Sequence, residues 1–131
     1  MMDLCKECSA CVRNCPTGAI PTDRFLLRVE YCLTFHNEHP ADVPFPDWID
    51  PSWHNCLVGC MHCQKLCPAN KKVINWVEPG PTFNEEETKL LLSGKSVEQL
   101  PEETRKKVEK HDLANYLNVY PRNLGAILNR E

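Results

Sequence analysis

The chain has 131 residues, with 18 acidic and 15 basic side chains and a formal net charge of -3. This charge gives no basic surface for nucleic acid or an anionic membrane, and neither is expected as a partner. No apolar run approaches the roughly 20 residues of a membrane-spanning helix, and no signal-peptide pattern precedes Cys5, so we expect a cytoplasmic protein.

The cysteine content is the most unusual feature of the composition. The chain has nine cysteines, and an odd number leaves one thiol unpaired in any scheme made only of disulfides. Because thiols stay reduced in the cytosol, cysteines at this density indicate bound metal rather than a disulfide scaffold. The cysteines stop after Cys67, so we expect a cysteine-rich domain over residues 1–78 and a helical C-terminal extension over residues 79–131.

The first cysteine motif is CKECSACVRNCP, residues 5–16. A cluster of four irons and four sulfides needs one thiolate on each iron, and a C-x2-C-x2-C loop can present three of them. The fourth cysteine, three residues later and followed by proline, leads the chain away, and in two-cluster ferredoxins it binds the other cluster. Proline biases the residue before it toward an extended conformation, so we expect Pro16 to end the turn. The motif predicts a [4Fe-4S] cluster.

Two short strands are predicted behind this motif. Residues 19–20 and 25–27 are apolar and flank a Pro-Thr-Asp turn, which is a pattern typical of a hairpin. In a bacterial-type ferredoxin such strands shield one face of the clusters from water, and this shielding influences the reduction potential. The predicted fold class is therefore α+β: a bacterial-type two-cluster ferredoxin-like domain followed by a small helical C-terminal cap.

Residues 36–55 form a proline-rich insertion between the two cysteine-rich stretches. Each of its four prolines removes a backbone donor and fixes a backbone angle, so we expect an ordered but irregular segment rather than a helix or strand. The insertion is too apolar for a free linker. Four large side chains are expected to pack over the core: Phe45, Trp48, Ile49 and Trp53.

A second motif, within residues 56–70, repeats the C-x2-C-x3-C-P ending of the first and indicates a second [4Fe-4S] cluster. Zinc is the alternative metal. Zinc prefers two C-x2-C pairs a dozen or more residues apart, and its tetrahedron has no vertex for a third cysteine two residues later. His62 lies between two of these cysteines and could donate a hydrogen bond to the cluster. The repeated cysteines are Cys8, Cys11 and Cys15 in the first motif and Cys60, Cys63 and Cys67 in the second.

From Asn84 onward the sequence is helical in character. Asn84 and Glu87 form a capping-box pattern ahead of a leucine-rich run, and Gly94 can terminate that helix. Pro101 and Pro121 suit the first positions of two further helices. Apolar residues at helical spacing predict the core of this cap: Leu90, Leu91, Val108, Leu113, Leu117, Leu124, Ile127 and Leu128.

The cysteine motifs resemble the two-cluster ferredoxin domain of the epoxyqueuosine reductase family and, more distantly, reductive dehalogenases and the reductive activators of corrinoid methyltransferases. The matching stretches are CKECSACVRNCPTGAI, RVEYCLTF and GCMHCQKLCPAN, within residues 5–70. The resemblance implies two [4Fe-4S] clusters that exchange one ligand between the motifs. It assigns one cluster to Cys5, Cys8, Cys11 and Cys67, and the other to Cys15, Cys32, Cys60 and Cys63.

Cys32 and Cys56 compete for one ligand position. By spacing alone, Cys56 completes a local set of four with the second motif and would replace Cys32. The family resemblance, which includes the sequence after Cys32, favours Cys32. The cysteine that is not a ligand is expected to be a buried, inert thiol.

The resemblance also implies a function, the relay of single electrons through both clusters to a corrinoid-type centre on an upstream cobalamin-binding domain or a redox partner protein. Only residues 1–4 precede Cys5, so no catalytic site is assigned, and we expect the electron-transfer part of an oxidoreductase. Two alternatives remain open. One is an iron-sulfur sensor of oxygen or redox state, and the other is a zinc-held interaction module that docks through the helical tail.

Overall fold

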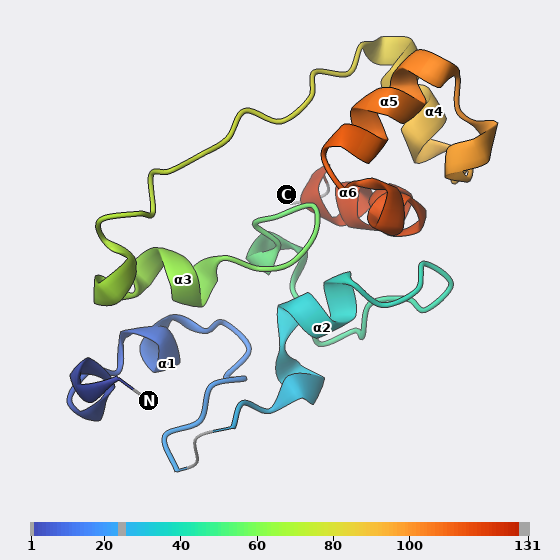
Figure 1. Ribbon diagram of the computed structural model, residues 1–131. Helices are drawn as coiled ribbons and strands as arrows, with labels where there is room; N and C mark the ends of the chain where they lie inside the picture. The colour runs from blue at the N-terminus through green and yellow to red at the C-terminus, as the bar shows by residue number, and fades with distance from the viewer. Residues whose placement is uncertain (1, 24–25, 129–131) are drawn as a thin grey trace.

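The computed structural model describes residues 2–23 and 26–128 (Figure 1). Within these ranges the chain forms short helices joined by irregular segments. No helix in these ranges has both the length and the apolar character needed to cross a bilayer. The α-helices are α1 (Ala10–Asn14), α2 (Leu33–Asn37), α3 (His62–Leu66), α4 (Glu85–Leu92), α5 (Glu102–Lys110) and α6 (Tyr120–Leu128). The 3-10 helices are η1 (Asp3–Lys6), η2 (Val29–Tyr31), η3 (Pro51–Trp53), η4 (Pro68–Asn70), η5 (Val97–Gln99) and η6 (Ala114–Val119).

The predicted α+β class is wrong, because the described residues contain no β-strand and the fold is helical and irregular. Most of the predicted hairpin is described, but residue 25 lies outside the described ranges. Its two arms meet through a backbone hydrogen bond of 2.8 Å from Arg28 N to Ala19 O. Pro21 has no N–H to extend this contact into a ladder, and a two-stranded hairpin alone is marginal in water. The ferredoxin-like sheet is therefore absent from the described part of the chain.

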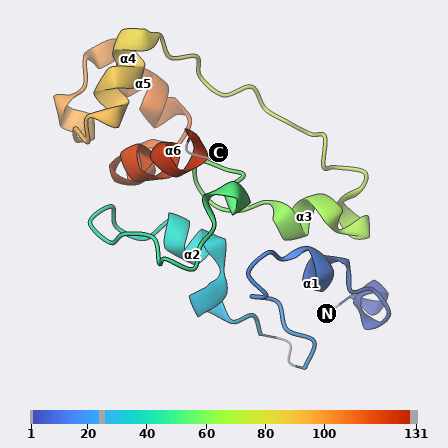
Figure 2. The same cartoon turned by 180° about the vertical axis from the view of Figure 1, so that it is seen from behind.

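The cysteine-rich part is organised around two of the shortest helices. Helices α1 and α3 pack side by side, as both views show (Figure 1 and Figure 2). They belong to the first and the second cysteine motif, respectively. The packing therefore brings together two motifs that are about 50 residues apart in the sequence.

The proline-rich insertion is mostly irregular, as predicted, although helix α2 includes its first two residues and η3 lies near its end. Ile49 is buried, and Phe45 and Trp53 are half-buried. Trp48 is 42% exposed, so the expectation that it packs over the core is wrong. Its ring instead lies 5.7 Å from the Tyr31 ring at the surface.

An extended segment joins η4 and the turns after it to helix α4, and it runs apart from the packed helices (Figure 1 and Figure 2). Trp76 and Val77 on this segment are 81% and 77% exposed. The predicted domain boundary between residues 78 and 79 falls here. The division into two domains itself stays a prediction.

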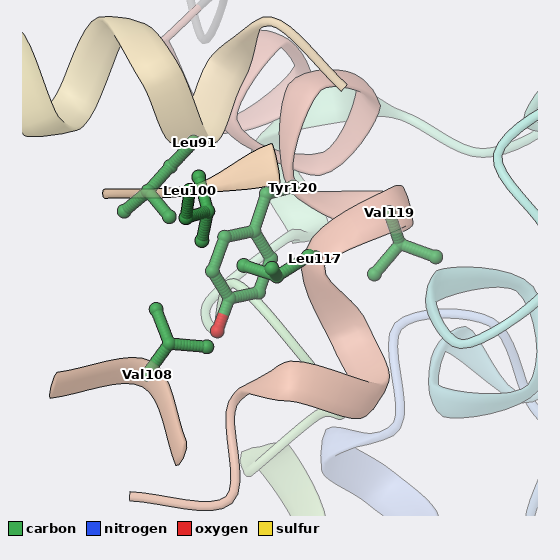
Figure 3. Packing of buried hydrophobic residues seen from close by; sticks show 6 residues of the cluster. All are labelled: Leu91, Leu100, Val108, Leu117, Val119 and Tyr120. Atoms are coloured by element: carbon green, nitrogen blue, oxygen red, sulfur yellow. The ribbon is translucent and has the colours of Figure 1, made fainter. Parts of the chain in front are cut away.

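The C-terminal part folds into a helical cap with its own apolar core (Figure 3). Three of its buried residues were predicted from helical spacing: Leu91, Val108 and Leu117. Leu128 was predicted in the core but is 70% exposed, because it faces outward in the last turn of α6. Three further core residues were missed because they lie at helix ends or in η6, outside a regular helical period: Leu100, Val119 and Tyr120.

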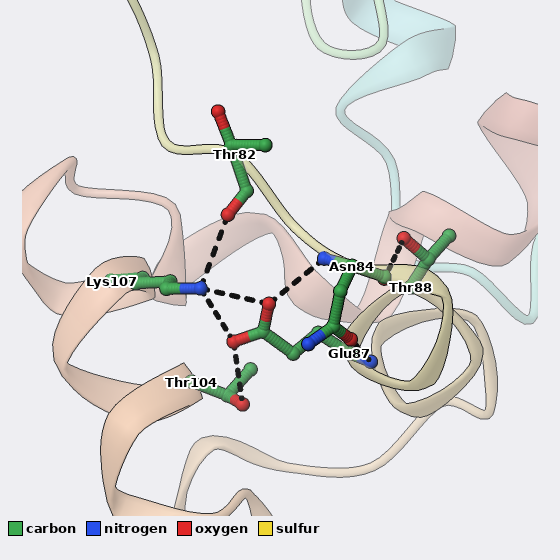
Figure 4. Close-up of polar contacts among 6 residues, drawn as sticks. All are labelled: Thr82, Asn84, Glu87, Thr88, Thr104 and Lys107. Atoms are coloured by element: carbon green, nitrogen blue, oxygen red, sulfur yellow. Dashed lines mark hydrogen bonds and ion pairs between the residues drawn. The ribbon is translucent and has the colours of Figure 1, made fainter.

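The predicted capping box at the start of α4 is confirmed (Figure 4). Glu87 N donates to Asn84 Oδ1 at 2.8 Å, and Asn84 N donates to Glu87 Oε2 at 2.9 Å. The helix ends before Gly94, whose φ of +71° is a conformation that favours glycine. Pro101 is the N-cap of α5, and Pro121 is the second residue of α6, each within one residue of the predicted place.

Candidate metal centre

All nine cysteines are free thiols, and each is partly buried. Such thiols are accessible enough to receive a cofactor and sheltered enough to keep it from bulk water. Among the described residues, no three His, Cys, Asp or Glu side chains converge on a single ion. A [4Fe-4S] cluster does not require such convergence, because each thiolate binds a different iron.

The two motifs have the same backbone conformation. The middle cysteine of the shared spacing is the second residue of a five-residue helix in both, Cys11 in α1 and Cys63 in α3. The last cysteine ends each helix in an extended conformation, with ψ of 111° at Cys15 and 120° at Cys67. Both precede a proline, which disfavours the helical region for the residue before it. The predicted role of Pro16 in ending the turn is therefore confirmed.

Three ligands predicted for one cluster line a common cavity. Cys5, Cys8 and Cys11 border a cavity of about 660 Å³, together with Ile20 from the predicted hairpin. Cys67, the fourth predicted ligand, is not among the lining residues. It follows α3, which packs against α1, so the second motif ends close to this part of the first.

Cys63 lies within electrostatic range of the three other predicted ligands of its cluster. Burial raises the pKa of the Cys63 thiol, and the neighbouring thiols of Cys60, Cys15 and Cys32 raise it further. These are the four cysteines that the resemblance assigns to one cluster. They come from four different places: Cys15 ends α1, Cys32 precedes α2, Cys60 precedes α3, and Cys63 lies within α3.

Cys15 lies in an environment that favours its thiolate. Burial opposes ionisation, but a hydrogen bond with the Thr17 hydroxyl and backbone hydrogen bonds from residues 17, 19 and 20 together lower the pKa of this thiol. The distance from Cys15 Sγ to Thr17 Oγ1 is 3.4 Å. A thiolate is the form in which cysteine binds a metal, so this environment suits a ligand.

Cys56 has a different environment from the neighbouring Cys60. Its thiol donates to Asn55 Oδ1 at 2.9 Å, whereas Cys60 Sγ accepts from Asn55 Nδ2 at 3.4 Å. Burial raises the pKa of Cys56, and the Cys60 thiol adds to the rise. An amide oxygen can only accept a hydrogen bond, so Cys56 is held as a protonated thiol in this arrangement.

A tight turn leads from Cys56 into the second motif. Gly59 has φ of +77°, a left-handed conformation that a residue with a side chain adopts at a cost. The buried Asn37 side chain holds this turn by accepting from Gly59 N at 2.7 Å and donating to Cys56 O at 3.4 Å. Because Asn37 ends α2, it connects the helix that follows Cys32 to the loop that precedes Cys60.

Two further residues, missed by sequence reasoning, attach the cap to this turn. Asn123 in α6 donates to Asn37 O at 2.9 Å and to Leu57 O at 2.8 Å. The Arg122 guanidinium lies 4.5 Å from the centroid of the Phe45 ring. It also donates to four backbone carbonyls, those of His36, Asn37, Pro40 and Val43. The only sequence signal was the PRNLGAILN segment, whose character resembles the same family.

His62 is engaged away from the cysteine sulfurs. Its Nε2 lies 2.9 Å from the backbone oxygen of Trp53. The ring therefore links α3 to η3, and the observed hydrogen bond differs from the predicted one toward the cluster. Asn55, which the sequence did not single out, donates to a ligand sulfur instead, that of Cys60 at 3.4 Å.

A second cavity, of about 380 Å³, lies beneath the cap. Its lining is apolar apart from Thr88 and the Tyr120 hydroxyl, and it includes Leu57 and Leu124. It shares no lining residue with the cavity of the first three cysteines. Nothing in its lining suggests redox or metal chemistry.

Comparison with known proteins agrees with the cysteine pattern. Residues 4–70, just over half of the chain, match a family model described as a 4Fe-4S double cluster binding domain. The epoxyqueuosine reductase of Prochlorococcus marinus (strain NATL2A) is 37% identical over 71 residues, which are 54% of this chain and 22% of that protein. The enzyme of the same name from Synechococcus sp. (strain CC9605) is 36% identical over 53% of this chain and 21% of its own length.

A third relative extends further along the chain. The epoxyqueuosine reductase of Listeria monocytogenes serovar 1/2a (strain ATCC BAA-679 / EGD-e) is 32% identical over 98 residues, or 69% of this chain and 24% of that protein. The chain thus spans between a fifth and a quarter of the length of these relatives. No solved structure is significantly similar to it.

These matches confirm the resemblance to epoxyqueuosine reductases and the prediction of two [4Fe-4S] clusters, and they give no support to zinc. Which cysteine binds which cluster stays a prediction. Three observations fit this cofactor: the free thiols, the cavity beside Cys5, Cys8 and Cys11, and the effect of the three other predicted ligands on the Cys63 thiol. The chain belongs to the family of 4Fe-4S double cluster binding domains.

Proposed function

We propose that this chain relays single electrons through two neighbouring [4Fe-4S] clusters. The observation that carries the proposal is the packing of α1 against α3, which brings two equivalent cysteine motifs together. When bound, each cluster supplies one-electron redox chemistry. The protein binds the clusters close together, limits the access of water and influences their reduction potentials.

The ligands that support this proposal form two sets. The first set is Cys5, Cys8, Cys11 and Cys67, and the second set is Cys15, Cys32, Cys60 and Cys63. Each motif then supplies its last cysteine to the cluster of the other motif. Cys56 stays outside both sets in this proposal, because its thiol donates a hydrogen bond to Asn55 Oδ1.

The acceptor is proposed from the resemblance and from the names of the relatives. Epoxyqueuosine reductases are oxidoreductases by name, and this chain matches about a fifth of their length. We propose that the electrons pass to a corrinoid-type centre on an upstream domain or a redox partner protein. Contacts between electron-transfer partners are typically small and transient.

Anaerobic stopped-flow mixing tests the relay and the acceptor separately. Dithionite-reduced, desalted protein is mixed with oxidised methyl viologen or with cob(II)inamide, and the cluster absorbance is followed. Reoxidation by both acceptors, with one electron leaving per reduced cluster, is expected. Reoxidation by methyl viologen but not by cob(II)inamide would support the electron relay and contradict the corrinoid acceptor. Release of iron instead of reversible reoxidation would contradict the relay and favour a sensor.

A further inference from the structure

Hydrogen bonds to cysteine sulfur are distributed unevenly between the two ligand sets. Cys60 Sγ lies 3.4 Å from Asn55 Nδ2, and Cys15 Sγ lies 3.4 Å from Thr17 Oγ1. Both cysteines belong to the second set. A third contact, from Gln64 Nε2 to Cys63 Sγ at 4.0 Å, falls on this second set as well.

The orientation of the Asn55 amide is fixed by two donors to its oxygen. Its Oδ1 accepts from Met61 N at 2.9 Å and from the Cys56 thiol at 2.9 Å. A backbone N–H can only donate, so the atom facing Met61 must be the amide oxygen. The Nδ2 group therefore faces Cys60 Sγ and, also at 3.4 Å, the Trp53 carbonyl. The amide cannot flip without placing donors against donors.

The first motif has no equivalent donor. Counted back from the shared C-x2-C-x3-C-P ending, the position of Asn55 corresponds to Asp3, and counted back from the first cysteine it corresponds to Leu4. Neither side chain carries an N–H group. Asp3 is also exposed and forms an ion pair with Lys6 at 2.7 Å. The two halves of the repeat therefore differ in a group that can act on a ligand sulfur.

A hydrogen bond to a ligand sulfur has a known electrostatic effect. The donor withdraws negative charge from the sulfur and stabilises the more negative, reduced state of the cluster, which raises its reduction potential. Asn55 also accepts from Met61 N, and Met61 is the N-cap of α3. The same amide thus orients the Cys60 sulfur and the start of the helix that carries Cys63.

We propose that Asn55 is a positioning residue that makes the two clusters unequal, so that the second set holds the cluster of higher reduction potential. Electrons then enter through the first cluster and rest on the second. This inference relies on the ligand sets of the proposed function. It extends them by assigning a direction to electron flow within the domain.

Redox titration followed by EPR tests this inference on the whole chain. Asn55→Asp keeps the oxygen that accepts from Met61 N but removes the donor to Cys60. Asn55→Ala removes the donor without adding charge, and Asn55→Gln restores an amide. Asn115→Asp, on the exposed face of η6, is the matched control for the added charge. Iron and sulfide content is measured for every variant.

The wild-type protein should show two different reduction potentials. Both Asn55→Asp and Asn55→Ala should lower the higher potential and so reduce the difference between the two, which is called the gap below. Asn55→Gln should recover part of the gap, and Asn115→Asp should leave it unchanged. If an Asn55 variant lost the cluster of the second set and retained that of the first set, this result would also support positioning of Cys60 by the amide. An unchanged gap, an equal shift of both potentials or loss of both clusters would overturn the inference. If wild-type protein holds two reducible clusters, these overturning results leave the electron relay intact.

Discussion

Asn123 Nδ2 lies 2.9 Å from the backbone oxygen of Asn37, and this contact joins the last helix of the cap to the cysteine-rich part of the chain. Both asparagines are almost fully buried. The side chain of Asn37 in turn holds the turn at Gly59 that leads into the second motif. The cap therefore stabilises the backbone that presents Cys60, although it contributes no cysteine of its own.

Asn123→Ala should destabilise the protein. The substitution leaves the buried carbonyls of Asn37 and Leu57 without this donor, and an unsatisfied buried polar group costs about 1–3 kcal/mol. The measurement is the midpoint of thermal unfolding by circular dichroism under anaerobic conditions. Asn118→Ala, at an exposed position of η6, is the control and should change the stability by no more than about 0.5 kcal/mol. Equal midpoints for the two variants would contradict the attachment.

Arg122→Lys should also destabilise the protein even though it preserves the charge. A lysine cannot present the planar fork that reaches several carbonyls and stacks on Phe45. We expect a loss of about 1.5–3 kcal/mol, the range for hydrogen bonds to charged groups. Arg105→Lys is the matched control, because Arg105 forms a surface pair with Glu109 at 3.9 Å, and such pairs contribute little. If the unfolding midpoint of Arg122→Lys were as high as that of Arg105→Lys, the guanidinium group of Arg122 would not be needed for stability.

Sequence patterns that span a few residues predicted the helix ends of the cap well. Contacts between residues far apart in the sequence could not be predicted. The Asn84 capping box and the end of α4 before Gly94 depend on residues a few positions apart, so they are visible in the sequence. The contacts of Arg122 and Asn123 cross more than 60 residues. Nothing in the local sequence distinguishes Asn123 from the exposed Asn118, because burial is a property of the folded chain.

The ligand sets predict different results for Cys32→Ser and Cys56→Ser. Cys56→Ser should retain about eight irons per chain, because two [4Fe-4S] clusters need eight ligands and Cys56 is outside both sets. Cys32→Ser should lose or convert one cluster and retain the other. Iron and acid-labile sulfide analysis, with EPR of the reduced protein, measures both. The reverse pattern would assign the ligand position to Cys56.

Glu87 provides a prediction with a defined pH range. The hydrogen bond from the Lys107 ammonium, at 2.8 Å, and the N–H of Asn84 hold the pKa of this carboxyl below its usual value (Figure 4). Because the folded pKa is lowered, the stabilisation is fully present above the unfolded value of about 4.3 and is lost as pH falls through the folded pKa. Glu87→Gln should therefore lower the unfolding midpoint by the same amount throughout pH 5.5–7.5.

The control for this prediction is Glu85→Gln, which removes an exposed i,i+4 pair with Lys89. Such a surface pair contributes little, so its midpoint should stay close to that of the wild-type protein. A Glu87→Gln deficit that grows as pH falls from 7.5 to 5.5 would mean that the folded protein takes up a proton at this carboxyl, and hence that its pKa is raised rather than lowered. No deficit at any pH would mean that the network in Figure 4 does not stabilise the cap.

The site was predictable to the extent that it depends on spacing. Pro16 and Pro68 fix the conformation of the cysteines before them, and the repeat therefore reappears as two equivalent helices. The predicted strands failed because strand formation needs partners, which sequence spacing does not supply. Asn55 was missed because its importance comes from the orientation of one amide between two thiols. That orientation is visible only in three dimensions.

The central claim is that one small domain holds two neighbouring clusters on eight cysteines, and cofactor content tests it most directly. Iron and acid-labile sulfide are measured on anaerobically purified protein, with EPR before and after dithionite reduction. We expect about eight of each per chain and a reduced EPR signal broadened by coupling between the two clusters. About four of each, or zinc without sulfide, would contradict it.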